Sequence, residues 1–219
     1  MTPSHSAFIA TLWLATGSPR RRDLLEQAGY RIAGRIRPAE PVDETIAEGE
    51  SAEDAARRLA GAKLEAALRA PDRPNGAVLL AADTLVVDPE GRPLGKPSDE
   101  TDAERMLAEL SGHWHQVVTA VAVGDGHTSR GCLVASRLRL AELPAAVIRA
   151  YVATGEPLDK AGAYGIQGRA GAFVEEIEGD CSAVVGLPLA RTRELLTAFG
   201  IRPAWMDRDA TGNDNENRA

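Results

Sequence analysis

The sequence has few aromatic residues, two cysteines and no long hydrophobic run. Phe, Trp and Tyr make up 4% of its 219 residues, which argues against the interleaved basic and aromatic side chains of single-stranded nucleic-acid binders. Cys132 and Cys181 provide neither a disulfide framework nor a metal-ligand spacing. The apolar run FIATLWLA (residues 8–15) is too short to span a bilayer and follows no Lys or Arg. We therefore expect a cytoplasmic protein without a membrane partner.

Acidic residues exceed basic ones, with 32 Asp and Glu against 25 Lys and Arg and a formal net charge of −7. Such a surface repels nucleic acid and anionic membranes, so we expect no nucleic-acid partner. A polyanionic ligand would need a local cluster of basic side chains. The 44% hydrophobic and 26% charged content is ordinary for a soluble globular protein, and the length allows one substantial core.

Segments with strand and helix patterns are mixed along the chain, which predicts a single α/β domain. We assign the domain to residues 1–203 and interpret residues 204–219, which are polar and charged after Trp205, as a disordered tail. Strands are predicted over residues 8–16, 77–88, 116–125, 131–140, 172–177 and 183–187, and helices over residues 19–29, 51–70, 99–110, 145–154 and 188–199.

The segment LATGSPRRRDLL (residues 14–25) begins a helix with charges of the wrong sign. Ser18 suits the N-cap and Pro19 the first helical position, but three arginines follow at residues 20–22. A helix N-terminus favours anions, so these cations cost roughly 0.3–1 kcal/mol each. The third arginine can pair with Glu26 on the helix surface. A phosphate bound by the free N–H groups and the other guanidiniums would explain the cluster.

A second unusual position is Asp83, inside the apolar segment AADTLVV. A carboxylate in a buried strand is costly unless it is paired or holds a cation, so Asp83 is either a hydrogen-bonded structural residue or an ion ligand. The segment LGKPSD returns Lys96 toward it, and PVDETIAEGES supplies Asp43 and Glu44 as oxygen ligands for a shared divalent ion. Lys63, at the edge of an apolar helix face, either extends into solvent or reaches a phosphate.

Glycine recurs at every third position of DKAGAYGIQG (residues 159–168), which also contains Lys160 and Gln167. The spacing matches neither a Walker A loop nor the dinucleotide fingerprint. The segment is either a turn-rich connection whose glycines serve the backbone, or a loop that closes over a base. In the second case the Gln167 amide would offer both a donor and an acceptor.

Together these motifs resemble the Maf family of nucleoside triphosphate pyrophosphatases. The resemblance extends over residues 14–199 and includes, in order, LATGSPRRRDLL, VDE, RRLAGAKLEAA, AADTLVV, LGKPSDETDAERMLAELSGHWHQVVTAV, YVATGEPLDKAGAYGIQG and VVGLPL. It implies one elongated α/β domain with a mixed central sheet flanked by helices and a deep nucleotide cleft, as in inosine triphosphate pyrophosphatases. It also implies hydrolysis of the α–β phosphoanhydride with a divalent cation, Mg²⁺ or Mn²⁺, a homodimer, and a link to arrest of septum formation.

The resemblance also implies roles for individual residues. Asp83 is the expected general base, and Glu44 and Asp83 are the expected metal ligands. The expected substrate-binding residues are Ser18, Arg20, Arg21, Lys63, Thr84, Lys96, Lys160 and Gln167.

Three of these positions, Arg20, Thr84 and Gln167, separate the dTTP/UTP branch of the family from the 7-methyl-GTP branch. We therefore expect dTTP and UTP as substrates. Thr16 and the run Cys181-Ser182-Ala183 depart from the common family pattern. Two alternatives remain open: a pyrophosphatase for modified nucleotides such as 5-methyl-UTP, pseudo-UTP or 7-methyl-GTP, and a nucleotide-binding regulator of septation without turnover.

Overall fold

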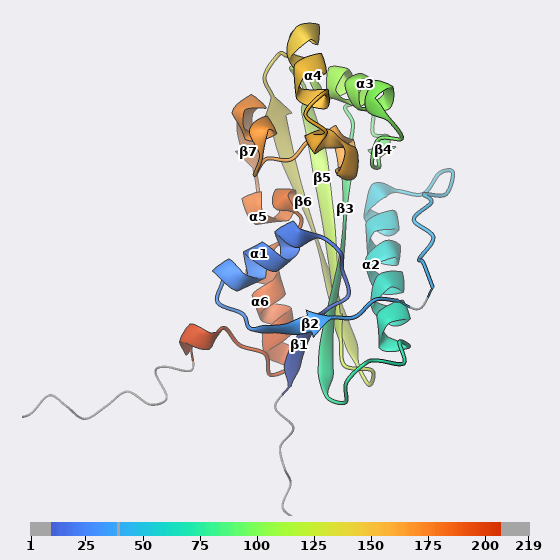
Figure 1. Cartoon of the computed structure of the whole chain (residues 1–219), viewed down its shortest axis with the longest axis vertical. Helices are drawn as coiled ribbons and strands as arrows, with labels where there is room; N and C mark the ends of the chain where they lie inside the picture. The colour runs from blue at the N-terminus through green and yellow to red at the C-terminus, as the bar shows by residue number, and fades with distance from the viewer. Residues whose placement is uncertain (1–9, 39, 207–219) are drawn as a thin grey trace, which may run out of the picture.

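Three long strands run along the length of the molecule (Figure 1). In the computed structural model, which describes residues 10–38 and 40–206, they are β3 (Ala77–Val87), β5 (Trp114–Gly124) and β6 (Ser129–Leu140). They are antiparallel neighbours in a seven-stranded sheet of order β2-β1-β3-β5-β6-β7, with β4 beside β3. Because β1 is parallel to both β2 and β3, the sheet is mixed. The predicted α/β fold with a mixed central sheet is confirmed.

The short strands and the helices surround this sheet. The other strands are β1 (Thr11–Leu14), β2 (Ile32–Arg35), β4 (Pro93–Leu94) and β7 (Val174–Glu178). The α-helices are α1 (Pro19–Gln27), α2 (Ala52–Leu68), α3 (Glu100–Leu110), α4 (Ala145–Val152), α5 (Cys181–Val185) and α6 (Leu189–Ala198), and three short 3₁₀ helices are η1 (Glu156–Asp159), η2 (Ala161–Ala163) and η3 (Arg169–Phe173). Among the described residues, no helix combines the length and the apolar character needed to cross a bilayer.

Side-chain alternation along β3 divides the core into two layers. Leu79 and Ala81 join the cluster formed with α2, whereas Leu80 and Ala82 join the cluster formed with α1 and α6. In Figure 1, α2 lies along one side of the long strands and α1 and α6 lie along the other, while α3 and α4 are at one end. All residues of β3 except Thr84 are buried, as predicted for a strand covered on both faces.

One edge of β3 is interrupted. β5 pairs with almost the whole of one edge, while the opposite edge carries β1 beside residues 77–80 and β4 beside residues 86–87. Within the described part of the chain, residues 81–85 pair with no strand on that second edge. Asp83 and Thr84 lie in this interval, and as consecutive strand residues their side chains point to opposite faces of the sheet. The interruption therefore gives access to both faces at one place.

The local sequence signals locate most helices correctly. Ser51 caps α2, since its side chain accepts a hydrogen bond from the Asp54 N–H at 3.1 Å. The predicted strand over residues 183–187 is wrong, because this segment belongs to α5 and its C-terminal turn. The Asp180 carboxylate caps α5 by accepting from the Ala183 N–H at 3.1 Å. A short apolar run does not distinguish a strand from a helix. Here the N-cap at Asp180 favours the helix.

The beginning and the end of the domain also differ from the expectations. β1 begins at Thr11 within the predicted strand over residues 8–16, and β2 was not predicted. At the other end, the Ala204 N–H donates to the Gly29 carbonyl at 2.8 Å and Trp205 Nε1 donates to the Ala28 carbonyl at 3.0 Å. Packing therefore continues past residue 203. The rest of the predicted tail, residues 207–219, lies outside the described residues.

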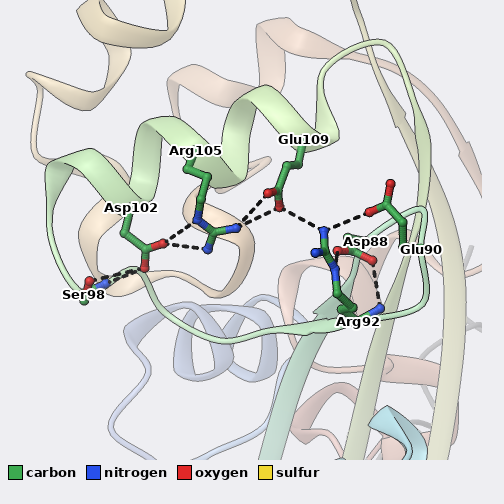
Figure 2. A network of polar contacts seen from close by, with 7 residues as sticks. All are labelled: Asp88, Glu90, Arg92, Ser98, Asp102, Arg105 and Glu109. Atoms are coloured by element: carbon green, nitrogen blue, oxygen red, sulfur yellow. Dashed lines mark hydrogen bonds and ion pairs between the residues drawn. The ribbon is translucent and has the colours of Figure 1, made fainter.

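A charged network joins the β3–β4 turn to α3 (Figure 2). Arg92 Nε contacts a carboxylate oxygen of Asp88 at 2.6 Å, and this carboxylate is fully buried. Arg92 Nη2 also lies 3.6 Å from Glu109 on α3. The drawn network comprises Asp88, Glu90, Arg92, Ser98, Asp102, Arg105 and Glu109. The segment that carries Lys96 is therefore anchored on both sides, by Arg92 before it and by Ser98 after it.

We predict that Asp88→Asn lowers the free energy of unfolding at pH 7 by about 1–3 kcal/mol, because the amide loses charge-assisted hydrogen bonds from Arg92. Burial raises the pKa of Asp88, but the backbone and side-chain hydrogen bonds from Arg92 outweigh it and hold the pKa below the ordinary value of 3.8. A carboxyl group with a lowered pKa stabilises the fold above its unfolded pKa, and this stabilisation is lost as the pH falls through the lowered pKa.

Urea unfolding between pH 2 and 7 measures this contribution. Asp88→Asn should be less stable than the wild type at pH 7 and should lose less stability on acidification. The exposed Asp72→Asn serves as the control. Parallel stability curves for the wild type and Asp88→Asn would contradict the role of the network.

Candidate active site

The interruption in the β3 edge opens into a cavity of about 590 Å³. This volume is in the range typical of small-molecule sites. Asp43, proposed as an ion ligand beside Glu44, does not line this cavity; its carboxylate accepts from the Thr45 N–H at 2.9 Å instead. The other ten residues that the sequence analysis proposed do line it. They are Ser18, Arg20, Arg21, Glu44, Lys63, Asp83, Thr84, Lys96, Lys160 and Gln167. The fold brings them together from six separate parts of the chain, and their chemical roles stay predictions.

The cavity is rich in positive charge although the protein carries a net charge of −7. Its cationic lining residues are Arg20, Arg21, Arg35, Lys63, Lys96 and Lys160, and its carboxylates are Glu44, Asp83 and Asp159. Cations thus outnumber carboxylates in a concave site, where low-dielectric walls strengthen their combined field. This is the local basic cluster that the acidic composition requires for a polyanionic ligand.

Lys63 joins the two predicted metal ligands. It extends from α2 toward β3, and its Nζ lies 2.5 Å from Asp83 Oδ1 and 2.6 Å from Glu44 Oε1. The side chains of Lys63 and Asp83 are 17% and 10% exposed, whereas that of Glu44 is 52% exposed. The buried charge of Asp83 is therefore compensated, whereas Glu44 lies at the solvent side of the pair.

The electrostatic surroundings favour an ionised Glu44. Burial raises the pKa of its carboxyl group, but the hydrogen bond and charge of Lys63, helped by Lys96 and Arg21, outweigh this effect and leave the pKa below its ordinary value. Two carboxylate oxygens that converge on one cationic position suit Mg²⁺, which typically takes one or two carboxylates together with substrate phosphates. Among the described residues, no group of three His, Cys, Asp or Glu side chains forms a complete metal site.

Arg21 is buried, and the acceptors of its hydrogen bonds are all uncharged. Its Nε donates to the Gly186 carbonyl at 2.8 Å, Nη1 to Thr16 Oγ1 at 2.9 Å, and Nη2 to Thr84 Oγ1 at 3.0 Å. Burial lowers the pKa of Arg21 to about 10 against the opposing effect of Asp83, so the guanidinium is charged at pH 7. No carboxylate of residues 10–38 or 40–206 forms an ion pair with it. An anion in the cavity would supply the missing negative charge.

The other two arginines of α1 have different surroundings. Arg22 Nε lies 2.8 Å from Glu26 Oε1, which confirms the surface pair expected for it. Arg20 instead faces the glycine-rich loop, with Nη1 3.7 Å from Asp159 Oδ2. Ser18 is the N-cap residue but its side chain makes no capping hydrogen bond. The N-terminus of α1 therefore lies beside two arginines that line the cavity, and the Ser18 hydroxyl there accepts no capping hydrogen bond.

The glycine-rich loop is shaped by side chains as well as by backbone conformation. Gly162 has a φ of +66°, which suits glycine. A Cβ atom at Gly165 would lie 2.7 Å from the Lys160 side chain, and one at Gly168 would lie 2.2 Å from Glu156 Oε1. The last two glycines thus make room for neighbouring side chains, a function that spacing alone did not reveal.

Lys160 and Glu156 stabilise this loop from within. Lys160 Nζ donates to the Glu156 carbonyl and to Asp159 Oδ1, both at 2.5 Å. The Glu156 carboxylate accepts from the Tyr151 hydroxyl at 3.1 Å and from the Arg169 backbone N–H at 3.2 Å. These contacts hold the wall that contains Gln167.

Several residues of the site were missed by sequence reasoning. Arg35 and Tyr164 line the cavity, and Thr119 supports Thr84 through a 2.9 Å contact between their Oγ1 atoms. The Tyr164 hydroxyl lies 2.8 Å from His115 Nε2, and burial lowers the pKa of His115 to about 4, which keeps the ring neutral at pH 7. These contacts join distant parts of the sequence, so no local motif signals them.

The fold and the cavity define an α/β protein with a cation-rich cavity at the open edge of its central sheet, where Asp83 is paired with Lys63. A family model described as Maf-like protein matches residues 11–199. The chain therefore belongs to the Maf family.

Relatives named dTTP/UTP pyrophosphatase match most of the chain. Those of Shewanella frigidimarina and Anaeromyxobacter dehalogenans are each 49% identical, over 188 and 198 residues, covering 85% and 89% of this chain and 96% of each relative. That of Aromatoleum aromaticum is 47% identical over 201 residues, covering 87% of this chain and 96% of the relative. The Staphylococcus aureus Ham1 structure gives a TM-score of 0.42 at 19% identity, covering 60% of this chain and 72% of that one.

We predict that Gly168→Ala destabilises the protein by about 1–3 kcal/mol, because the added methyl group forces the Glu156 carboxylate away from its hydrogen-bond donors. Gly61→Ala is the matched control, since an added Cβ there meets no atom within 4 Å. In the helix interior it should stabilise by about 0.5–1 kcal/mol. Urea unfolding of both variants tests the difference, and equal stabilities would show that Gly168 makes no room for Glu156.

Proposed function

We propose that the protein hydrolyses dTTP and UTP to the nucleoside monophosphate and pyrophosphate. The observation that carries this proposal is the position of Asp83 at the open edge of β3, 2.5 Å from Lys63 and inside a cavity with six cationic side chains. The names of the relatives agree with this reaction. A triphosphate supplies the charge that the cavity lacks, and a carboxylate inside a cationic cavity suits the activation of a water molecule.

In the proposed mechanism Asp83 takes a proton from the attacking water. Its carboxylate is fixed by the rigid β3 strand and by Lys63, so its orientation is set before the substrate enters. Arg21, Lys96 and Lys160 stabilise the negative charge of the phosphate chain, which is the main contribution a protein makes to phosphoryl transfer. Arg20 and Ser18 bind phosphate at the beginning of α1.

Glu44 and Asp83 would hold a divalent cation, Mg²⁺ or Mn²⁺, together with oxygens of the substrate. The convergence of their oxygens on Lys63 Nζ supports this assignment. When bound, such an ion neutralises phosphate charge and lowers the pKa of a coordinated water. Lys63 would then retain its contact with one carboxylate and stay near the phosphate chain.

Base selection is assigned to Gln167 and Thr84. The Gln167 amide can both donate to and accept from the edge of uracil or thymine. The Thr84 hydroxyl accepts from Arg21 and contacts Thr119 Oγ1 at 2.9 Å. Thr84 therefore couples the buried arginine to the base side of the cavity, so its effect on selection would depend on Arg21.

Two further assignments belong to this proposal. We place the protein in the cytoplasm with the nucleotide pool, and we retain the homodimer as a prediction. A regulator of septation that binds nucleotide without turnover would use the same cavity, and pyrophosphatases for modified nucleotides would use the same chemistry. Pyrophosphate release distinguishes the regulator from both enzymes, and the preferred nucleotide distinguishes the two enzymes from each other.

The proposed reaction is tested by measuring pyrophosphate release from dTTP, UTP, CTP, ITP, 5-methyl-UTP, pseudo-UTP, 7-methyl-GTP and the common purine triphosphates. We expect the highest kcat/KM with dTTP and UTP, dependence on Mg²⁺ or Mn²⁺, and loss of turnover with a chelator. Tight nucleotide binding without pyrophosphate release would instead support the regulator. Preference for a modified nucleotide would support the second alternative.

We predict that Asp83→Asn lowers kcat by at least about 10²-fold, because an amide cannot accept the proton from water. The exposed Asp23→Asn, which lies on α1 outside the cavity, should retain wild-type kcat. Thermal unfolding of both variants controls for folding. An Asp83→Asn protein that is folded and turns over at more than a tenth of the wild-type rate would refute the general-base assignment.

We also predict that Gln167→Ala reduces the preference for UTP over CTP by about three- to tenfold, the equivalent of one net hydrogen bond. The kcat with the preferred substrate should change less than this ratio, because the residue is assigned to the base and not to the phosphates. Competition kinetics with both nucleotides in one reaction measures the ratio directly. An unchanged ratio would remove Gln167 from base selection.

A further inference from the structure

Arg35 is a cationic side chain of the cavity that neither the sequence motifs nor the resemblance assigned to the site. It is the last residue of β2 and pairs in register with Leu14 of β1. In Figure 1, β2 and β1 lie next to each other below α1. Because the two strands are parallel, their carboxyl ends meet at the same edge, where ligands of open α/β sheets commonly bind. The side chain of Arg35 lines the cavity there.

The guanidinium of Arg35 lies directly against Gly17, in the loop that leads to Ser18. A Cβ atom at Gly17 would be 2.8 Å from Arg35 Nη2 and 3.3 Å from Cζ. Gly17 is not among the glycines with positive φ, so its backbone conformation is open to other residues. A larger residue at this position would therefore displace the guanidinium of Arg35 from its place beside the loop.

Arg35 has no partner for its charge. Its guanidinium makes no hydrogen bond or ion pair with any residue in the ranges 10–38 and 40–206, whereas some surface arginines, such as Arg22 and Arg58, are paired with carboxylates. The arginines on either side in sequence, Arg31 and Arg37, are exposed as Arg35 is, but they do not line the cavity. Arg35 thus differs from its neighbours in facing the ligand space with all its donors available.

We propose that Arg35 is a further substrate-binding residue, whose guanidinium binds phosphate oxygens of the substrate next to Gly17 and Ser18. This inference rests on the proposed function for the identity of the substrate. Arginine suits the role because its planar donors bind two oxygens of one phosphate. Gly17 then has two functions, since it leaves space for the guanidinium and lets the phosphate approach the backbone of the loop.

The test compares Arg35→Gln with the matched control Arg37→Gln in the full-length protein. Calorimetry measures the dissociation constants of inorganic tripolyphosphate, pyrophosphate and UMP. We expect Arg35→Gln to weaken tripolyphosphate binding about tenfold, which corresponds to the loss of one charge-assisted hydrogen bond. Arg37→Gln should stay within twofold of the wild type. Equal affinities for the two variants would overturn the proposal.

The smaller ligands identify which phosphates Arg35 contacts. A tenfold loss for pyrophosphate with UMP unchanged places Arg35 on the β- and γ-phosphates, and the opposite result places it on the α-phosphate. Both results support a phosphate contact, whereas an unchanged affinity for all three ligands contradicts it. The binding assay needs no turnover. A wild type that releases no pyrophosphate from nucleotides would refute the proposed function, while the effect of Arg35→Gln on tripolyphosphate would still test this inference.

Gly17→Ala provides a second, independent measurement. Its added methyl group should displace the guanidinium of Arg35 and weaken tripolyphosphate binding about tenfold. In the Arg35→Gln background the same substitution should cost less than threefold, because the contact is already lost. A full tenfold loss in both backgrounds would show that Gly17 acts without Arg35 and would contradict the proposed pairing.

Discussion

The interruption of the β3 edge between β1 and β4 determines where this protein can hold a ligand. Over residues 79–80 and 86–87 of β3, strands pair on both sides and side chains pack on both faces. At the interruption, strand alternation directs Asp83 toward α2, where Lys63 meets it, and directs Thr84 toward α1, where Arg21 meets it. Charged groups from both layers of the protein therefore reach one cavity, and each depends on the rigid strand for its position.

The charges of the cavity are balanced only in part before a ligand enters, since its six cations outnumber its three carboxylates. Lys63 forms ion pairs with both Asp83 and Glu44, and Asp159 offsets part of the charge of Arg20 and Lys160. These pairs reduce the cost of keeping like charges close together in a low-dielectric site. A phosphate chain could replace Asp159 as the partner of the loop cations, and Arg21 would gain an anion that it lacks. The net charge of −7 over the whole protein would oppose the approach of larger polyanions such as nucleic acid.

Physical anomalies in the sequence located much of the site. Arginines at the beginning of a helix and a carboxylate within an apolar strand are unfavourable without a partner, and both proved to face the cavity. The alternation of apolar runs and caps likewise predicted the mixed α/β fold and most of its helices. What local sequence could not provide was the pairing of distant segments. The short strand β2 and the contact of Arg21 with the Gly186 carbonyl depend on chain segments that meet only after folding. The helix α5 was missed for a different reason, because the local cap at Asp180 was overlooked beside a short apolar run.

The central claim is that a nucleoside triphosphate binds with its α–β bridge beside Asp83, and it is tested most directly by a crystal structure of Asp83→Asn with UTP and Mg²⁺. We expect the bridging oxygen next to residue 83, the phosphates among the cationic side chains of the cavity, and the uracil toward Gln167. UTP bound outside the cavity, or bound with its uracil at Lys63 and its phosphates at Gln167, would contradict the account.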